Sequence, residues 1–191
     1  MAYIDKIIIK LRNKAEWEII KSKMDLSDGR TIYGKSYSFE ERSFFDNQFS
    51  MQCPTEFKDM PESIASRKYI SQQRPPVILT SSSFEVDITF NLIKDSIQRH
   101  EVAAYRQELQ KTIRSVYPAN QFYDTGEIEK ANLPIEFFEF KSFALGGSLY
   151  NNMFITSIHG RGLMGTFNCP FDQFPEWRDA VFLMIGSLAE L

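Results

Sequence analysis

The feature that most constrains the fold is an unbroken alternation of apolar and polar residues over Phe84–Leu92. The apolar members are Phe84, Val86, Ile88, Phe90 and Leu92, and the polar members are Glu85, Asp87, Thr89 and Asn91. Successive side chains of a β-strand point to opposite faces, so this period predicts a strand with one face in the core and one in water. Such alternation is typical of an antiparallel sheet that is covered on one side.

Aromatic runs predict further strands along the chain. The sequence has 17 Phe and 8 Tyr residues, and bulky flat side chains of this kind suit pleated, half-buried surfaces. The apolar residues of one expected strand, Ile135–Phe143, change parity midway, which indicates a β-bulge or burial on both faces. The other expected strands are Ile7–Leu11, Thr31–Phe39 paired with Arg42–Cys53, Val77–Ser81, Leu149–Ile158 and Leu163–Cys169, with a tight hairpin at His159-Gly160-Arg161-Gly162 between the last two.

Two segments have the apolar spacing of amphipathic helices. His100–Tyr117 places apolar side chains at intervals of three and four, and Pro118 ends it. Phe174–Leu191 has a second apolar stripe, and its Pro175 falls in the first turn, where proline is tolerated. Shorter helical character is found at Lys14–Met24 and around Glu62–Arg67.

The order of these elements predicts an α+β fold. Strands occur in runs interrupted by two helices, without the strand–helix alternation of a parallel sheet, so we expect an antiparallel β-sheet with two amphipathic helices packed on it. A chain of 191 residues suits one domain. We therefore expect a single domain over residues 1–191, in which residues 1–40 are an added N-terminal element.

Five segments carry a resemblance to a known superfamily: FSMQCPTEF, SFEVDITFNLI, HEVAAYRQELQKTI, MFITSIHGRGLMGTFNCP and FPEWRDAVFLMIGSL. In content and order, from about Gln48 to Leu191, they resemble the PsbP/Mog-like superfamily. The resemblance implies an α/β sandwich, and members that are mostly non-enzymatic binding or assembly proteins with partners that differ between branches. It places this chain nearest to bacterial proteins of unknown function.

Composition excludes several classes of function. The 22 basic and 25 acidic residues include no concentrated basic face, which argues against a nucleic-acid partner. Cys53, Cys169, His100 and His159 stand in none of the spacings of a zinc site, and two cysteines are too few for a disulfide scaffold. We expect no metal, no cofactor, no membrane-spanning segment and a cytoplasmic location, since no leader or long apolar run is present.

The candidate binding residues fall at two places. Glu85, Asp87 and Asn151 are expected on the open polar face of the sheet, where they would form a shallow recognition surface. His159 and Arg161 share the hairpin turn, whose backbone amides could hold an anion. A rival surface, which could equally belong to the core, is the aromatic group Tyr33, Tyr37, Phe39, Phe44 and Phe45.

These observations favour a non-catalytic protein-binding or assembly module, with a protein partner and a monomeric or homodimeric state. An immunity or secretion-accessory protein that masks a toxin is the narrower form of this hypothesis. The alternative is a small hydrolase or ligand-binding enzyme that uses the polar face of the sheet, where Glu85 and Asp87 would act as acid and base. No nucleophile elbow or other catalytic motif is present in the sequence.

Overall fold

The structure is a computed structural model that describes residues 26–71, 74–128, 130, 132–144 and 146–191. The strand and helix expected at Ile7–Leu11 and Lys14–Met24 lie outside the described residues. The strands are β1 (Arg30–Ile32), β2 (Lys35–Tyr37), β3 (Phe39–Phe44), β4 (Phe49–Pro54), β5 (Lys58–Asp59), β6 (Val77–Thr80), β7 (Asp87–Ser96), β8 (Gln121–Ile128), β9 (Ile135–Ala144), β10 (Gly147–Ile158), β11 (Arg161–Pro170) and β12 (Ala189–Glu190). The helices are α2 (Glu62–Lys68), α3 (Val102–Val116) and α4 (Phe174–Ser187), with single 3-10 turns at Arg99–Glu101 and Phe171–Gln173.

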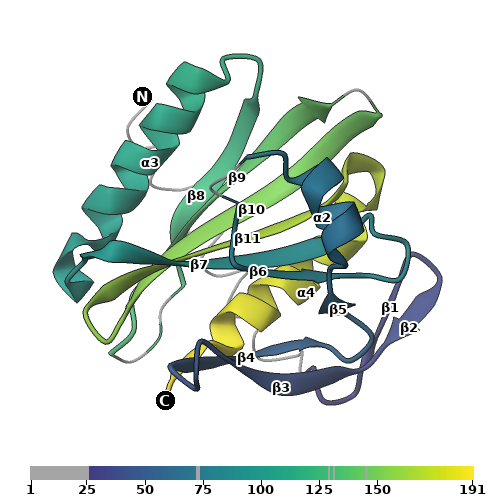
Figure 1. Ribbon diagram of the computed structural model, residues 1–191, viewed down its shortest axis with the longest axis horizontal. Coiled ribbons are helices and arrows are strands. Elements are labelled where there is room, and N and C mark those ends of the chain that lie inside the picture. The colour runs from purple at the N-terminus through teal and green to yellow at the C-terminus, as the bar shows by residue number, and fades with distance from the viewer. Residues whose placement is uncertain (1–25, 72–73, 129, 131, 145) are drawn as a thin grey trace, which may run out of the picture.

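The strands form one large antiparallel sheet and two small ones (Figure 1). The seven-stranded sheet has the order β5-β6-β7-β11-β10-β9-β8, and the three-stranded sheet has the order β12-β4-β3. β1 and β2 form a separate hairpin. At the expected hairpin between β10 and β11, Ile158 pairs with Arg161, and the two turn residues His159 and Gly160 have positive φ. The predicted α+β class with antiparallel sheets is confirmed.

Helices α3 and α4 cover opposite faces of the large sheet. On β9, Glu136 is paired with Arg106 of α3, whereas the next residue, Phe137, contacts Phe182 of α4 edge-on at 4.7 Å between ring centroids. Consecutive residues of a strand point to opposite faces, so both faces of the sheet are covered at β9. The expectation of an uncovered polar face is therefore wrong.

The main core lies between the large sheet and α4, and β3 and β4 pack on the same side. Phe90 of β7 contacts Phe44 at 4.6 Å and Phe49 at 5.3 Å, which are on β3 and β4. Trp177 of α4 is fully buried against Phe167 of β11. Cys53 and Cys169 are free, buried thiols in this core.

Three segments differ from the expected element bounds. The predicted strand pair over residues 31–53 is two hairpins, because Tyr33 and Gly34 adopt positive φ and turn the chain between β1 and β2. β7 begins at Asp87 instead of Phe84, which lies in the preceding turn with a φ of 59°. α4 ends at Ser187, and the next residues form β12 on the edge of β4 instead of a last helical turn.

The parity change within Ile135–Phe143 reflects burial on both faces. Every residue from Ile135 to Phe140 is buried, including Glu136 and Glu139. The bulge lies in the neighbouring strand, where Tyr123 and Asp124 of β8 together face a single residue of β9.

The rival aromatic group is mostly core. Tyr37 and Phe44 are buried, and Phe39 and Phe45 pack against the main core from its border. Tyr33 alone of these five has a largely exposed ring, at the tip of the β1–β2 hairpin. Four members of this group therefore stabilise the fold.

Candidate functional site

Two of the predicted binding residues, Asp87 and Asn151, lie in one row across the large sheet. Asp87 of β7 is opposite Asn168 of β11, and Asn168 is opposite Asn151 of β10. Directly opposed residues share a face, and neighbouring strands are about 4.8 Å apart, so Asp87 and Asn151 are separated by about 10 Å. The structure thus brings the two onto one face, with Asn168, which sequence reasoning missed, between them.

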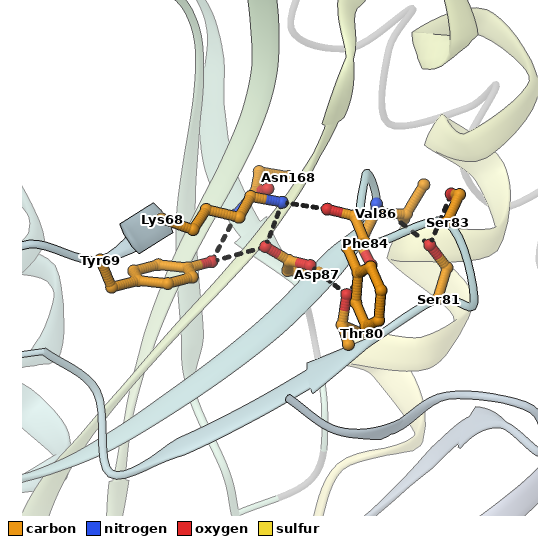
Figure 2. A network of polar contacts seen from close by, with 9 residues as sticks. All are labelled: Lys68, Tyr69, Thr80, Ser81, Ser83, Phe84, Val86, Asp87 and Asn168. Atoms are coloured by element: carbon orange, nitrogen blue, oxygen red, sulfur yellow. Dashed lines mark hydrogen bonds and ion pairs between the residues drawn. The ribbon is translucent and has the colours of Figure 1, made fainter. Parts of the chain in front are cut away.

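The Asp87 carboxylate is completely buried and has three polar partners (Figure 2). Lys68 Nζ lies 2.6 Å from Oδ2, and the Tyr69 hydroxyl donates a hydrogen bond of 2.8 Å to the same oxygen. Thr80 Oγ1 donates to Oδ1 at 2.6 Å. Both carboxylate oxygens are engaged, as a buried charge requires.

This network joins segments that are distant in sequence. Lys68 and Tyr69 stand at the end of α2, Thr80 is on β6, and Lys68 Nζ also donates to the carbonyl oxygen of Phe84 at 2.7 Å. Burial, and then the negative charge of Asp87, raise the pKa of Tyr69, so its hydroxyl stays a hydrogen-bond donor. The arrangement fixes α2 and the β6–β7 turn to the sheet and leaves no carboxylate oxygen for a substrate.

The two asparagines of the row are also held within the protein. Asn168 Nδ2 donates to the Tyr69 hydroxyl at 3.3 Å, which extends the Asp87 network onto β11. Asn151 Nδ2 donates to Ser142 Oγ at 2.9 Å and to the carbonyl oxygen of Phe140 at 3.3 Å. The prediction that Asp87 and Asn151 line an exposed surface is wrong, because both side chains are buried beneath the elements of the α3 face.

The remaining predicted residues lie elsewhere. Glu85 is exposed in the β6–β7 turn, outside the strand. His159 lies at the hairpin tip, where its backbone N–H and Nδ1 are each 2.9 Å from Glu190 Oε1. Arg161 is half-buried, opposite Ser96 of β7. At a rise of about 3.4 Å per residue, the end of β10 is about 24 Å from Asn151, so the five residues form no single site.

A second buried polar cluster lies on the α4 face. The carboxylate of Glu139, only 1% exposed, accepts hydrogen bonds from Arg178 Nε at 3.0 Å and from a terminal nitrogen of the same guanidinium at 2.8 Å. The Tyr150 hydroxyl donates to Glu139 as well, and Arg178 also binds Asp124 at 2.8 Å. Burial is the largest single influence and lowers the pKa of Arg178, but the hydrogen bonds to Glu139 and the negative charges of Glu139 and Asp124 together raise the pKa of the guanidinium overall.

This cluster holds the β8 bulge. Asp124, one of the two bulged residues, is fixed to α4 through Arg178, and the other, Tyr123, stacks on Phe171 with ring centroids 6.1 Å apart. Both side chains therefore lie on the α4 side of the sheet edge. A bulge at an edge strand commonly redirects a side chain in this way.

An exposed aromatic surface with a lysine at its centre results. Lys141 Nζ lies 4.1 Å from the ring centroid of Phe171 and 5.4 Å from that of Phe143. The side chains of Tyr123 and Phe143 are 45% and 54% exposed. We name Tyr123, Lys141, Phe143 and Phe171 the aromatic–lysine patch. The one sequence signal near it is the parity change in Ile135–Phe143, which predicts a β-bulge or burial on both faces and no binding surface.

Comparison with solved structures identifies the fold. The chain superposes on cyanobacterial PsbP (CyanoP) from Synechocystis with a TM-score of 0.59 and 8% identity, over 85% of this chain and 98% of that one. The fold is PsbP-like. A protein from Bacteroides thetaiotaomicron matches with a TM-score of 0.51 and 10% identity, over 80% of this chain and 48% of that one. LpqN of Mycobacterium tuberculosis, which is involved in cell envelope biogenesis, matches with a TM-score of 0.48 and 12% identity, over 83% of this chain and 93% of that one.

The likeness is one of structure alone. No protein-family model matches the chain, and no curated protein matches it. Identities this low show a shared PsbP-like fold and carry no residue roles across.

Two kinds of functional feature are absent from the described residues. None of the helices that the structure describes is long and apolar enough to cross a membrane. Within the same residues, no three His, Cys, Asp or Glu side chains come together in a group that could hold a metal ion.

Proposed function

We propose that this PsbP-like chain is a non-catalytic protein-binding or assembly module, and that the aromatic–lysine patch is its contact surface. The observation that carries the proposal is the exposure of Tyr123 and Phe143 around Lys141 on a rigid support. Exposed aromatic clusters of this kind are typical of protein interfaces, where aromatic side chains supply most of the binding energy.

Further exposed apolar side chains lie at the end of the helix that precedes β8. Val116 and Tyr117, at the end of α3, lead directly into β8 and are each 60% exposed. β8 is the last strand of the large sheet, so its outer edge pairs with no described strand. A partner placed here would contact apolar side chains beside that edge.

The alternative, a hydrolase that uses the polar face of the sheet, has little support. Its acid–base pair would be Glu85 and Asp87, but Asp87 is buried with both oxygens engaged, and Glu85 lies in an exposed turn. A general base must reach a substrate proton, and Asp87 is not accessible to a substrate.

The proposed unit is the single domain of residues 1–191, with residues 1–40 as an added element, in a bacterial, cytoplasmic member of the PsbP/Mog-like superfamily. The free, buried thiols of Cys53 and Cys169 suit a reducing compartment. A role as an immunity or secretion-accessory protein is the narrower form of the proposal. Glu85, His159 and Arg161 are not fully buried and stay candidates for additional partner contacts.

Affinity isolation from the native source tests the proposal. The bait carries Tyr123→Ser together with Phe143→Ser, and the control bait carries Ile70→Ser, which removes an apolar side chain that is 85% exposed at another place. We expect one protein to be recovered repeatedly with the wild-type and control baits and to be lost with the patch variant. Recovery that is equal with all three baits, or no repeatable partner, would count against the proposed function.

A further inference from the structure

We infer that the aromatic–lysine patch recognises an acidic segment of a partner protein, in which a carboxylate lies between apolar side chains. This inference rests on the proposed function and specifies the chemistry of the partner. It follows from the environment of one cation, Lys141, on the α4 side of β9.

The ammonium of Lys141 lies against aromatic rings and forms no ion pair with a carboxylate of the described residues. It contacts the rings of Phe171 and Phe143, and the cross-strand neighbours of Lys141 are Gln121 and Tyr150. The nearby Asp124 carboxylate is engaged by Arg178 at 2.8 Å. Cation–π contacts compensate an ammonium for only part of its lost hydration, so its hydrogen-bond donors remain available.

The rings around Lys141 define what else the occupant must contain. The rings of Phe143 and Phe171 lie 5.4 Å and 4.1 Å from the ammonium, and Tyr123 stacks on Phe171. A carboxylate that reaches Lys141 would form a charge-assisted hydrogen bond, and its neighbouring side chains would lie against these rings. Polar or basic neighbours would lose hydration there without gaining a partner, so apolar neighbours are favoured.

The patch is held in place by buried contacts. Lys141 stands two residues after Glu139 on the same face of β9, and Glu139 is fixed by Arg178 and Tyr150. Phe171 begins the turn before α4 and also stacks on Phe174, with centroids 5.6 Å apart. Little side-chain freedom is therefore lost when a partner binds, which favours affinity from a small contact area.

The charge of the rest of the chain does not favour an acidic partner, so the contact with Lys141 must supply the attraction. Residues 115–191 contain nine acidic and four basic residues, so an acidic partner is not attracted from a distance. Binding then depends on the contact with Lys141 itself. Replacing this one residue should change which segments are recognised.

The test begins with selection of peptides from a random display library on the full chain. We expect the selected peptides to contain Asp or Glu flanked by apolar residues, and to be lost on the chain with Tyr123→Ser and Phe143→Ser. The tightest peptide is then measured by fluorescence anisotropy beside a matched peptide in which Asp and Glu are replaced by Asn and Gln.

A double-mutant cycle isolates the contact. Lys141→Met keeps the apolar stem of the side chain. We expect this variant to bind the acidic peptide about tenfold more weakly, which corresponds to about 1.4 kcal/mol, and to bind the neutral peptide with unchanged affinity. Lys141→Arg should retain the affinity. Lys111→Met, on the exposed side of α3, serves as the control and should not change the affinity for either peptide. Unchanged circular dichroism would show that each variant is folded.

The results separate the two proposals. Two outcomes would overturn the inference and leave the proposed protein-binding function in place. In one, the selected peptides bind only when Tyr123 and Phe143 are present but contain no acidic residue. In the other, Lys141→Met lowers the affinity for the acidic and the neutral peptide equally. If no peptide depends on the patch and the native partner is also retained by the patch variant, both fail. Patch-dependent self-association in sedimentation, or patch-dependent binding to phosphatidylserine vesicles without peptide binding, would likewise overturn the inference.

Discussion

Single residues with buried charge mark the places where separate segments of this chain meet. Asp87 joins the end of α2 to β6 and β7, and Glu139 joins β9 to α4 and, through Arg178, to β8. A buried carboxylate is costly unless its oxygens are paired, so each of these networks also determines which segments can pack together. We therefore assign Asp87 a structural role.

Replacing Asp87 tests this assignment. Asp87→Asn removes the charge opposite Lys68, and we expect the free energy of unfolding to fall by about 2–4 kcal/mol, because a buried pair loses one partner. Glu85→Gln, in the exposed turn nearby, should change it by less than about 0.5 kcal/mol. Urea denaturation of both variants provides the comparison. Equal stability of Asp87→Asn and the wild type would contradict the structural role.

The buried thiols predict a loss of stability at alkaline pH. Burial raises the pKa of Cys53 to about 12 and also raises that of Cys169. An unfolded thiol ionises near pH 8.5, so above this pH the unfolded chain binds fewer protons than the folded chain, and the free energy of unfolding falls by about 1.4 kcal/mol per pH unit for each thiol.

Cys53→Ala removes one of the two contributions. Its unfolding free energy should decline less steeply than that of the wild type between about pH 8.5 and pH 12, while all other titrating groups are shared by the two proteins. Denaturation series across this range give the two slopes. Identical slopes would show that the pKa of Cys53 is the same in the folded and the unfolded chain.

Among the elements, the β10–β11 hairpin depends on a glycine for its packing. Gly165 is opposite Phe154, and a Cβ on Gly165 would come within 2.0 Å of the Phe154 ring. The fully buried ring thus occupies the space that a side chain would need. The chain can place an aromatic residue of β10 flat over β11 only because residue 165 has no side chain.

Gly165→Ala should therefore destabilise the protein by about 3 kcal/mol, because buried overpacking forces the ring or the backbone to move. Gly146→Ala is the matched control, since a Cβ there meets nothing within 4 Å. Thermal denaturation followed by circular dichroism measures both variants. Similar melting temperatures for the two variants would show that the Phe154 ring can move aside without loss of stability.

The sequence predicted element types better than it predicted exposure. Helices α2, α3 and α4 and the β10–β11 hairpin follow from periodicity, proline and glycine, which act locally. The alternation in β7 indicates that the strand has one apolar and one polar face. It does not indicate that Asp87, on the polar face, is buried, because this burial results from tertiary contacts with Lys68 and Tyr69. The edge bulge at Tyr123 and Asp124 depends on Arg178 of a distant helix, so no local pattern predicts it.

For the whole molecule, the PsbP-like fold explains why the candidate surface lies at the β8 edge. Helices α3 and α4 pack on opposite faces of the large sheet, so both faces are covered at β9 (Figure 1). The edge strand and the side chains beside it remain accessible, and the aromatic–lysine patch lies there. The predicted Asp87–Asn151 surface is replaced by one that the sequence analysis did not predict.

Site-specific photo-crosslinking in cells of the native source tests this account most directly. A benzophenone amino acid at position 143, in the patch, should give one discrete crosslinked protein, and that product should disappear when Tyr123→Ser is added. The same amino acid at position 70, which is exposed elsewhere, should give none. No crosslink at position 143, or the same product from position 70, would contradict a protein-binding role for the aromatic–lysine patch.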